Sequence, residues 1–346
     1  MKKFLKSILL ILFFSLAILF LNQLSVNAAE VTTANTLEEL KTAFEEKAII
    51  DGNTIKLTDN VILKDNVVDI KIPEAIMDFN GKTIECSGTG GIRIFNKLTF
   101  RDTSTTNRLY WGGIIFNHER SSSIDVWTGA ELIIDNGKFV DGGIATTGGK
   151  IYVSGKLTIN DAVFSTNRIE PAHEYNYMIS LSYDSECVIN SGEFSHTDTI
   201  IYIGGSKYSN NCKLTINAGN FNCSYGDAIE IYTFYPYVDD DGNKEVITPK
   251  ITLNNCNIEA THTAIGFWGG CTDEEFRNEN TQILTILGGN YKSSKQNNGS
   301  PLEIRTYADP NTYFNPKDFV LQGGTFETLS DVLGAIGLLG PRKRWV

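Results

Sequence analysis

Three charged residues lie in short apolar segments and have the side-chain types that act on glycosidic bonds. Glu230 lies within Ala228–Thr233 (AIEIYT), and Glu303 and Arg305 lie within Leu302–Tyr307 (LEIRTY). Two carboxyl groups about 6.5–9.5 Å apart can serve as the acid and the base of an inverting glycosidase. An Arg can instead be the base or the charge stabiliser of a lyase. Glu230, Glu303 and Arg305 are therefore the candidate catalytic residues.

Aromatic residues in the same and similar segments form a candidate ligand-binding set. They are Tyr202, Tyr232, Trp268 and Tyr307. An aromatic ring can stack on the CH face of a sugar while nearby charged groups bond to the sugar hydroxyls. The alternative is an ordinary solvated sheet face, where aromatic residues on adjacent strands support the sheet.

These segments alternate between apolar and other residues, which predicts short strands with one buried face. If Ile229 and Ile231 point inward, Glu230 and Tyr232 point outward. The same alternation predicts one outward column of Ser180, Tyr202, Glu230, Gly266 and Glu303, and a second of Ser182, Gly204, Tyr232, Trp268 and Arg305. Glu230 and Glu303 would then lie two strands apart, with about 9–10 Å between backbones. A slip of one residue would reverse every assignment.

An eight-residue phrase recurs seven times and predicts the fold. It reads apolar, Thr or apolar, apolar, Asn-like, any, Gly-like, any, aromatic. The copies begin 25 to 37 residues apart and are Leu132–Phe139, Leu157–Phe164, Cys187–Phe194, Leu214–Phe221, Ile251–Ile258, Leu284–Tyr291 and Phe319–Phe326. One such unit cannot bury its own apolar face, whereas stacked units can. We therefore expect an all-β protein built as a parallel solenoid, with a β-sandwich as the alternative.

Stacking would place like residues of the phrase above one another. The final positions predict an internal column of Phe139, Phe164, Phe194, Phe221, Ile258, Tyr291 and Phe326. The fourth positions predict a polar ladder of Asp135, Asn160, Asn190, Asn217 and Asn254. Stacked Asn amides can hydrogen-bond along the axis, so both columns are expected to be structural.

The two ends of such a stack need protection, because unpaired strand edges invite pairing with other chains. Thr36–Phe44 has an N-cap Thr, a Glu three residues later and apolar residues at helical spacing, which predicts a capping helix. Leu329–Leu339 also carries apolar residues at helical spacing and is expected to close the other end.

The predicted capping helix, the phrase DFNGKTI within Ile76–Ile84, and the LTI-N-x-G-x-F units together resemble the pectate lyase-like superfamily, and in particular secreted surface proteins of Gram-positive bacteria. The resemblance covers about residues 30 to 330 and implies a single right-handed parallel β-helix. It implies no one activity, because the superfamily includes lyases, hydrolases, esterases and adhesins. The N-T-D, G-H-G and R-I-K phrases of pectinase hydrolases are missing from the sequence.

The one run of Asp residues, Asp239–Asp241, lies in an insertion that reads as a β-hairpin with an Asp-Gly turn. The run misses the Asp-x-Asp-x-Asp-Gly calcium pattern, because Tyr237 stands where the first Asp would be. We expect no resident metal or other cofactor, with Ca²⁺ as the open alternative.

The first 28 residues read as a secretory signal peptide. Lys2, Lys3 and Lys6 precede an apolar run shorter than the about 20 residues that span a bilayer, and cleavage is expected after Ala28. An uncleaved anchor is the alternative. The predicted plan is a signal peptide at 1–28, a β-helix domain at 29–330 and a C-terminal cap or tail at 331–346.

Removal of the three Lys residues with the signal peptide takes the formal net charge from −11 to −14. An acidic surface argues against nucleic acid and against bare anionic membranes as partners. We expect a secreted or cell-surface protein without a membrane span in its mature form, and a monomer.

The six Cys residues have no zinc-binding spacing and sit where the repeat places small or apolar residues. We expect buried thiols, although export would allow disulfides. His196 and Cys223 hold the same place in adjacent units, and we interpret them as core or corner residues rather than a nucleophile pair.

Two functions of different class follow. The first is an adhesin-like protein that binds polysaccharide or host and matrix glycans without chemistry, as the missing pectinase phrases favour. The alternative is a polysaccharide lyase or glycoside hydrolase acting on an acidic polysaccharide. A purely structural spacer is the third interpretation.

Overall fold

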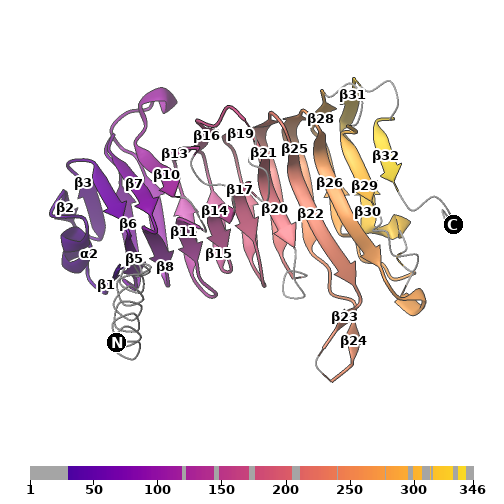
Figure 1. Cartoon of the computed structure of the whole chain (residues 1–346), viewed down its shortest axis with the longest axis horizontal. Helices are drawn as coiled ribbons and strands as arrows, with labels where there is room; N and C mark the ends of the chain where they lie inside the picture. The colour runs from indigo at the N-terminus through magenta and orange to yellow at the C-terminus, as the bar shows by residue number, and fades with distance from the viewer. Residues whose placement is uncertain are drawn as a thin grey trace, which may run out of the picture.

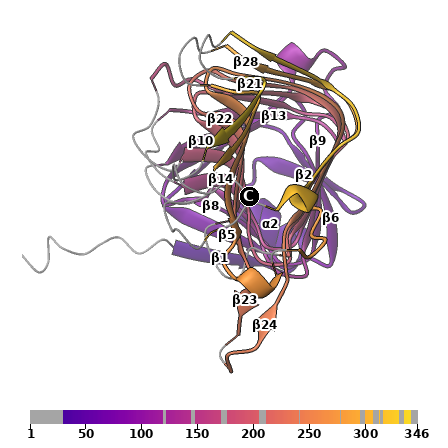
Figure 2. The ribbon, with the colours of Figure 1, turned by 90° about the vertical axis from the view of Figure 1, so that its right-hand side faces the viewer.

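The computed structural model describes residues 30–118, 122–143, 148–170, 176–204, 211–239, 241–276, 278–294, 299–305, 312, 315–329 and 334–339. The chain is mostly β and elongated, with successive strands side by side from the N-terminal to the C-terminal end (Figure 1). Seen along the long axis, the strands of successive coils overlie one another (Figure 2). This arrangement is the one expected of a stacked solenoid.

The first long sheet has eleven strands, and every pairing in it is parallel. In order they are β1 (Glu30–Ala34), β5 (Asn66–Ile70), β8 (Gly91–Ile94), β11 (Ile124–Val126), β14 (Gly148–Val153), β17 (Asn176–Leu181), β20 (Thr199–Gly204), β22 (Asp227–Tyr235), β26 (Thr263–Cys271), β29 (Leu302–Arg305) and β32 (Ile336–Leu339). Each strand pairs with the strand one coil further along the chain. We call this the eleven-stranded sheet.

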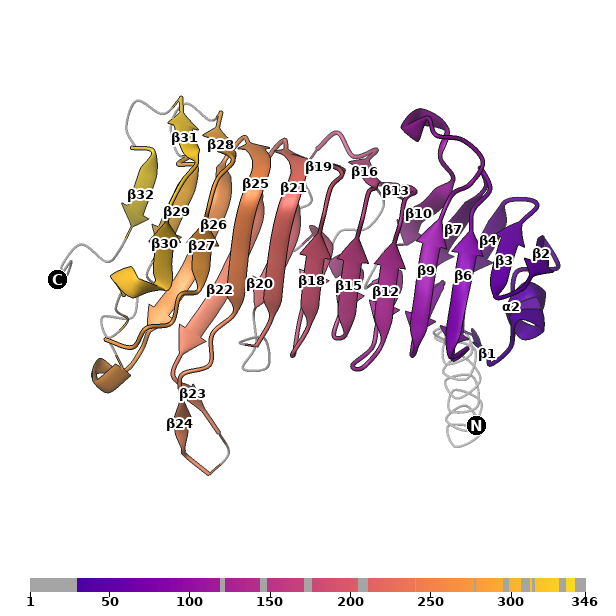
Figure 3. The ribbon, with the colours of Figure 1, turned by 180° about the vertical axis from the view of Figure 1, so that it is seen from behind.

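The second long sheet carries the repeated phrase and is visible from behind (Figure 3). Its strands are β2 (Ala48–Asp51), β3 (Thr54–Leu57), β4 (Val61–Lys64), β6 (Glu74–Asp78), β7 (Thr83–Gly88), β9 (Lys97–Arg101), β10 (Gly113–His118), β12 (Glu131–Ile134), β13 (Lys138–Asp141), β15 (Lys156–Ile159), β16 (Val163–Thr166), β18 (Glu186–Ile189), β19 (Glu193–His196), β21 (Lys213–Cys223), β25 (Lys250–Ala260), β27 (Leu284–Ile286), β28 (Asn290–Ser293), β30 (Phe319–Leu321) and β31 (Thr325–Thr328). Its pairings are parallel except for β2 with β3.

The prediction that like positions stack is confirmed. Phe164 pairs in register with Phe139 on one side and Phe194 on the other. The rings of Phe139, Phe164, Phe194 and Phe221 are stacked, with centroids 4.9, 4.9 and 4.4 Å apart. All four are buried, so the column forms part of the core between the two sheets.

The polar ladder is also confirmed. Asn190 Nδ2 donates to Asn160 Oδ1 at 2.9 Å, and Asn217 Nδ2 donates to Asn190 Oδ1 at 2.7 Å. A second ladder, which the sequence analysis missed, runs through the seventh position of the phrase. There Asn257 Nδ2 donates to Asn220 Oδ1 at 2.9 Å and Asn290 Nδ2 donates to Asn257 Oδ1 at 2.7 Å.

The predicted helix near the N-terminal end is present as α2 (Leu37–Ala43). Thr36 is its N-cap and accepts a hydrogen bond from the backbone N–H of Glu39 at 3.2 Å. Leu40 and Phe44 are buried, and the helix contacts β1, β2, β3 and β5. It lies at the indigo end of the stack (Figure 1).

The expectation of a helix across Leu329–Leu339 is wrong where the chain is described. Ile336–Leu339 is the strand β32, which pairs in parallel with β29. The free edge of β29 offers backbone partners, and Gly337 is a poor helix former. Gly337 also lies where a Cβ atom would come within 2.6 Å of Ser300 Oγ, so this place on the sheet suits glycine. Residues 330–333 lie outside the described part.

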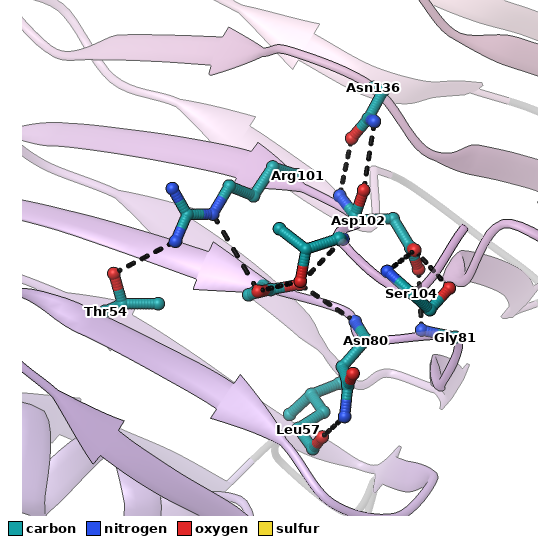
Figure 4. Close-up of polar contacts among 10 residues, drawn as sticks. Thr54, Leu57, Asn80, Gly81, Arg101, Asp102, Ser104 and Asn136 are labelled. Carbon is teal, nitrogen blue, oxygen red and sulfur yellow. Dashed lines mark hydrogen bonds and ion pairs between the residues drawn. The ribbon is translucent and has the colours of Figure 1, made fainter. Parts of the chain in front are cut away.

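Two buried Asp residues, Asp78 and Asp102, fix the turns of the early coils. Figure 4 shows the contacts around Asp102. Asp102 accepts hydrogen bonds from the backbone N–H groups of Gly81 at 2.7 Å and Gly112 at 2.8 Å. Asp78 accepts from the N–H groups of Asn80 at 3.0 Å and Thr103 at 3.1 Å. Each carboxylate therefore satisfies backbone donors that a tight corner leaves unpaired.

Short elements complete the described chain. The predicted hairpin is confirmed as β23 (Tyr237–Val238) paired antiparallel with β24 (Lys244–Glu245), and it projects from the stack (Figure 2). The 3₁₀ helices are η1 (Arg108–Tyr110), η2 (Glu274–Phe276) and η3 (Pro316–Asp318). Among the described residues, no helix is long and apolar enough to cross a membrane. The predicted signal peptide lies outside these residues.

Candidate ligand-binding face

The two predicted outward columns lie in register across the eleven-stranded sheet. Tyr202 pairs with Glu230, Glu230 with Gly266, and Gly266 with Glu303. In the next column, Tyr232 pairs with Trp268 and Trp268 with Arg305. The inward neighbours Ile229, Ile231, Ile265 and Phe267 are all fully buried. The alternation in the sequence therefore assigned the faces of these strands correctly.

A third column was missed because two consecutive buried residues follow the first residue of β20, β22 and β26. Ile200 and Ile201 are both buried, as are Ala228 and Ala264 with the Ile that follows each. Two buried residues in a row reverse the alternation, so the preceding residues return to the outer face. Thr199 and Asp227 accordingly lie beside Glu230, and Thr199 Oγ1 donates to Glu230 Oε2 at 3.3 Å. The recurring signal was an apolar residue directly before the inward Ile.

A mainly apolar groove of about 650 Å³ opens on this face over β11, β14 and β17. Its lining includes Trp127, Tyr152, Tyr177, Tyr183 and Ser180. The ring of Tyr177 stacks on that of Tyr202, with centroids 4.1 Å apart, so the aromatic surface continues from the groove to the predicted columns.

A further column, which we call the edge column, crosses the eleven-stranded sheet one place after the second inward-pointing residue of each strand. It has aromatic stacks at both ends. At one end Lys71 Nζ lies 5.1 Å from the centroid of Phe95, whose ring stacks on Trp127 at 4.9 Å. At the other end Tyr232 stacks on Trp268 at 5.8 Å. The guanidinium of Arg305 lies 4.3 Å from the centroid of Trp268. Between the two stacks the column holds the small residues Ser154, Ser182 and Gly204.

An acidic group lies beside the second aromatic stack. His262 Nδ1 and Asp227 Oδ1 are 2.5 Å apart. Glu230 is partly buried, and its pKa is raised to about 7 by desolvation and by the charge of Asp227, against the hydrogen bond from Thr199 and the charges of Arg305 and His262. Near neutral pH, this face therefore presents a carboxyl that exchanges its proton beside a His–Asp pair.

Glu303 differs from Glu230 in its surroundings. Its side chain is only 1% exposed and accepts hydrogen bonds from Thr263 Oγ1 at 3.0 Å and from Arg305 Nε. Arg305 in turn covers Trp268. Glu303 thus holds Arg305 in place, whereas Glu230 lies beside Asp227 and His262.

Gly266 lies between Glu230 and Glu303, and its missing side chain lets the Asp227 carboxylate approach the strand. A Cβ atom on Gly266 would lie 2.4 Å from Asp227 Oδ2 and 3.4 Å from Trp268 Nε1. Trp268 Nε1 is buried and finds no hydrogen-bond partner within the described residues. A water molecule or a ligand acceptor that reached Trp268 Nε1 would satisfy this donor.

Several other predicted residues do not join this face. Tyr307 lies outside the described residues. His196 and Cys223 are both buried and pair in register, as core residues should; the His196 ring contacts Asp141, and burial raises the pKa of Cys223 to about 12. All six Cys residues are buried. No group of three or more His, Cys, Asp or Glu side chains suited to a metal ion occurs in the described chain.

Comparison of the chain with protein-family models, with curated proteins and with solved structures finds no match.

Proposed function

We propose that this chain is an exported bacterial protein of the pectate lyase-like kind, a right-handed parallel β-helix capped by α2. Its outer face on the eleven-stranded sheet binds a polysaccharide. The protein is secreted or held at the cell surface after cleavage behind Ala28, and it acts in the manner of an adhesin. The contacts of α2 with the first strands of both sheets, and the parallel pairing of successive coils, support this architecture.

The aromatic groove is the observation that carries this function. Tyr152, Tyr177 and Trp127 line it, and Trp127 is 46% exposed, whereas Tyr177 is 7% exposed and stacks on Tyr202. An exposed aromatic ring suits the CH face of a sugar ring, and the polar groups next to it suit hydroxyls.

The arrangement favours a chain polymer that runs along the solenoid axis. Trp127 and Tyr232 belong to the same edge column and are separated by four strand spacings, about 19 Å. The edge column holds only the small residues Ser154, Ser182 and Gly204 between them, so the two aromatic stacks lie at the two ends of a stretch without large side chains. A polymer of several sugar units would reach both stacks, whereas a monosaccharide would reach one.

The test is retention of the exported form on a panel of immobilised polysaccharides. Trp127→Ala and Tyr232→Ala should each weaken binding of a retained polymer about tenfold, or about 1.4 kcal/mol. Tyr110→Ala is the matched control, because Tyr110 is 71% exposed on η1 and does not line the groove. Unchanged retention in both Trp127→Ala and Tyr232→Ala would refute this binding face.

Cleavage of an acidic polysaccharide is the second candidate, favoured by one observation. Glu230 has a pKa of about 7 beside the Asp227–His262 pair, which suits a group that donates or accepts a proton near neutral pH. Glu230, Glu303 and Arg305 remain the candidate catalytic residues, with Glu303 orienting Arg305. Ca²⁺ remains a candidate bridge between an acidic polymer and this acidic chain.

The same panel separates the two functions when it is also scored for reducing or unsaturated ends. Retention without new ends supports binding alone. If new ends form, Glu230→Gln should reduce their release at least a hundredfold while retention persists. Release that survives both Glu230→Gln and Glu303→Gln would rule out this catalytic assignment.

A further inference from the structure

A buried polar group lies inside the coils, away from the ligand-binding face. Asp141 ends β13, Lys150 lies in β14, Asn176 begins β17 and His196 ends β19. Lys150 and Asp141 are 0% exposed, His196 is 1% exposed and Asn176 is 2% exposed. A lysine without access to water is rare, because burial of an ammonium group is costly unless it is paired.

The contacts bring an amine, a carboxamide and a carboxylate together. Lys150 Nζ donates a hydrogen bond to Asn176 Oδ1 at 2.9 Å, so the amide carbon is one bond from the atom that the amine already touches. Asp141 Oδ1 lies 3.7 Å from Lys150 Nζ. The amide nitrogen of Asn176 donates to Asp198 Oδ2 at 2.8 Å.

The sequence position of Lys150 is unusual for this fold. It occupies the first place of the buried pair that opens the strands of the eleven-stranded sheet, where the following coils have Met178, Ile200 and Ala228. An apolar side chain would fill that place without requiring Asp141 and Asn176. Lys150 is therefore not explained by packing alone.

Burial makes Lys150 easier to deprotonate, while His196 and Lys150 keep Asp141 in the ionised form that can accept a proton. Burial lowers the pKa of Lys150, against the attraction of Asp141, and the charge of Arg168 lowers it further. Burial opposes ionisation of Asp141, but a hydrogen bond from His196 and the charge of Lys150 outweigh it and hold its pKa below the ordinary value. A proton that passes from Lys150 to Asp141 converts a dry ion pair into two neutral groups, which a low-dielectric interior tolerates.

We propose that Lys150 and Asn176 join in an intramolecular isopeptide bond between two neighbouring coils. Asp141 takes one proton from the Lys150 ammonium group, and the neutral amine attacks the Asn176 amide carbon. A new Nζ–Cγ bond forms and the Cγ–Nδ2 bond breaks. The second nitrogen proton passes to the departing nitrogen, which becomes ammonia, takes up the proton held by Asp141 and leaves as ammonium, so that Asp141 is again ionised. No oxidant, reductant or other reactant is needed.

Each neighbour has a distinct part in this reaction. Asp141 is the proton carrier, and His196 and the backbone N–H of Gly143 hold its carboxylate in place at 3.2 and 3.0 Å. Asp198 orients the Asn176 amide nitrogen. Holding the reacting groups in contact replaces an encounter in solution, and exclusion of water protects the amide from hydrolysis.

The test is peptide mass analysis of the full exported chain after reduction and digestion. The expected product is a branched peptide that contains both Lys150 and Asn176, with a mass lower by one ammonia than the sum of its parts. Trypsin should not cleave after Lys150 in that species. Recovery of Lys150 and Asn176 only in separate, unmodified peptides would overturn the proposal, whatever the variants do.

Two variants assign the roles. Asp141→Ala retains both reacting residues but should not form the bond, so its peptides should show no loss of ammonia. Bond formation at an unchanged level would refute the part given to Asp141. Lys150→Met fills the same place with an apolar side chain and should abolish the branched peptide. Lys156→Met, an exposed change on β15, should leave the branched peptide intact.

Discussion

Two sets of carboxylates in this molecule have opposite surroundings. At the corner of the early coils, Asp78 and Asp102 are buried and accept hydrogen bonds from backbone N–H groups (Figure 4). On the proposed ligand-binding face, Asp227 and Glu230 lie next to each other, to an imidazole and to aromatic rings. The first pair accepts hydrogen bonds from backbone N–H groups, whereas the second pair contacts side chains.

The difference shows how to separate structural from functional acids in a repetitive fold. A carboxylate that satisfies backbone donors is already fully used, and its loss leaves those donors unpaired. A carboxyl that is desolvated beside another acid is destabilised as an anion, and a ligand or a proton can relieve that strain. Burial alone does not distinguish the two sets, since both lie largely out of water.

The most severe test of the comparison is Asp102→Ala. Loss of its carboxylate leaves the N–H groups of Gly81 and Gly112 without an acceptor, so the free energy of unfolding should fall by about 3 kcal/mol. Denaturant titration measures this loss. Asp59→Ala, at an exposed site, is the control and should change stability by about 0.5 kcal/mol or less. A loss of similar size in both variants would remove the structural role of Asp102.

Glu303→Gln tests a carboxylate that is as buried as Asp102 but accepts its hydrogen bonds from side chains. It leaves Arg305 without its charged partner in a largely buried position, and we expect a stability loss of about 2 kcal/mol. Glu74→Gln is the matched control, because the Glu74–Lys97 ion pair is exposed and its loss should change stability much less. Equal losses would show that Glu303 does not hold Arg305.

The pH dependence of stability sharpens the comparison further. Because Glu230 has a pKa of about 7 in the folded chain and an ordinary value of 4.5, the folded state holds more protons between these values. Stability should therefore decrease by about 1–2 kcal/mol as the pH rises from 4.5 to 7. Glu230→Gln should remove this part of the pH dependence, measured as denaturation midpoints at several pH values. The exposed variant Glu245→Gln should retain it; a Glu230→Gln curve parallel to the original would contradict the assignment.

The smallest expected effect concerns side-chain contacts in water. Asn217→Ala interrupts the exposed ladder between Asn190 and Asn254, and stability should fall by about 0.5 kcal/mol. Asn222→Ala, exposed on the same strand, is the control. A loss of stability as large as that of Asp102→Ala would contradict this expectation and would mean that the ladder fixes the register of the coils.

The repeated phrase was sufficient to predict much of the architecture. Its aromatic and Asn positions recur in most copies of the phrase, so the stacked Phe column and the first ladder followed directly from parallel stacking. Alternation also assigned Glu230 and Trp268 to one outer face. These features depend only on short-range periodicity, which a single sequence contains.

Features that break the periodicity were missed or wrong. Asp227 reaches the face because two buried residues precede Glu230 and shift the alternation by one place. Tyr152 and Trp127 were overlooked because their strands are short or contain Lys150 at a core position. The helix expected over Ile336–Leu339 gave way to pairing with β29, a tertiary contact that outweighed local helical spacing.

The in-register pairing of like phrases has a consequence for how such a chain changes over evolutionary time. A duplicated coil would present the same apolar, Asn and aromatic positions to the coils above and below it, as Leu157–Phe164 does to its neighbours. Duplication or loss of whole coils would then lengthen or shorten the molecule without disturbing either end. The reach of the protein becomes a trait that can vary independently of the chemistry on its surface.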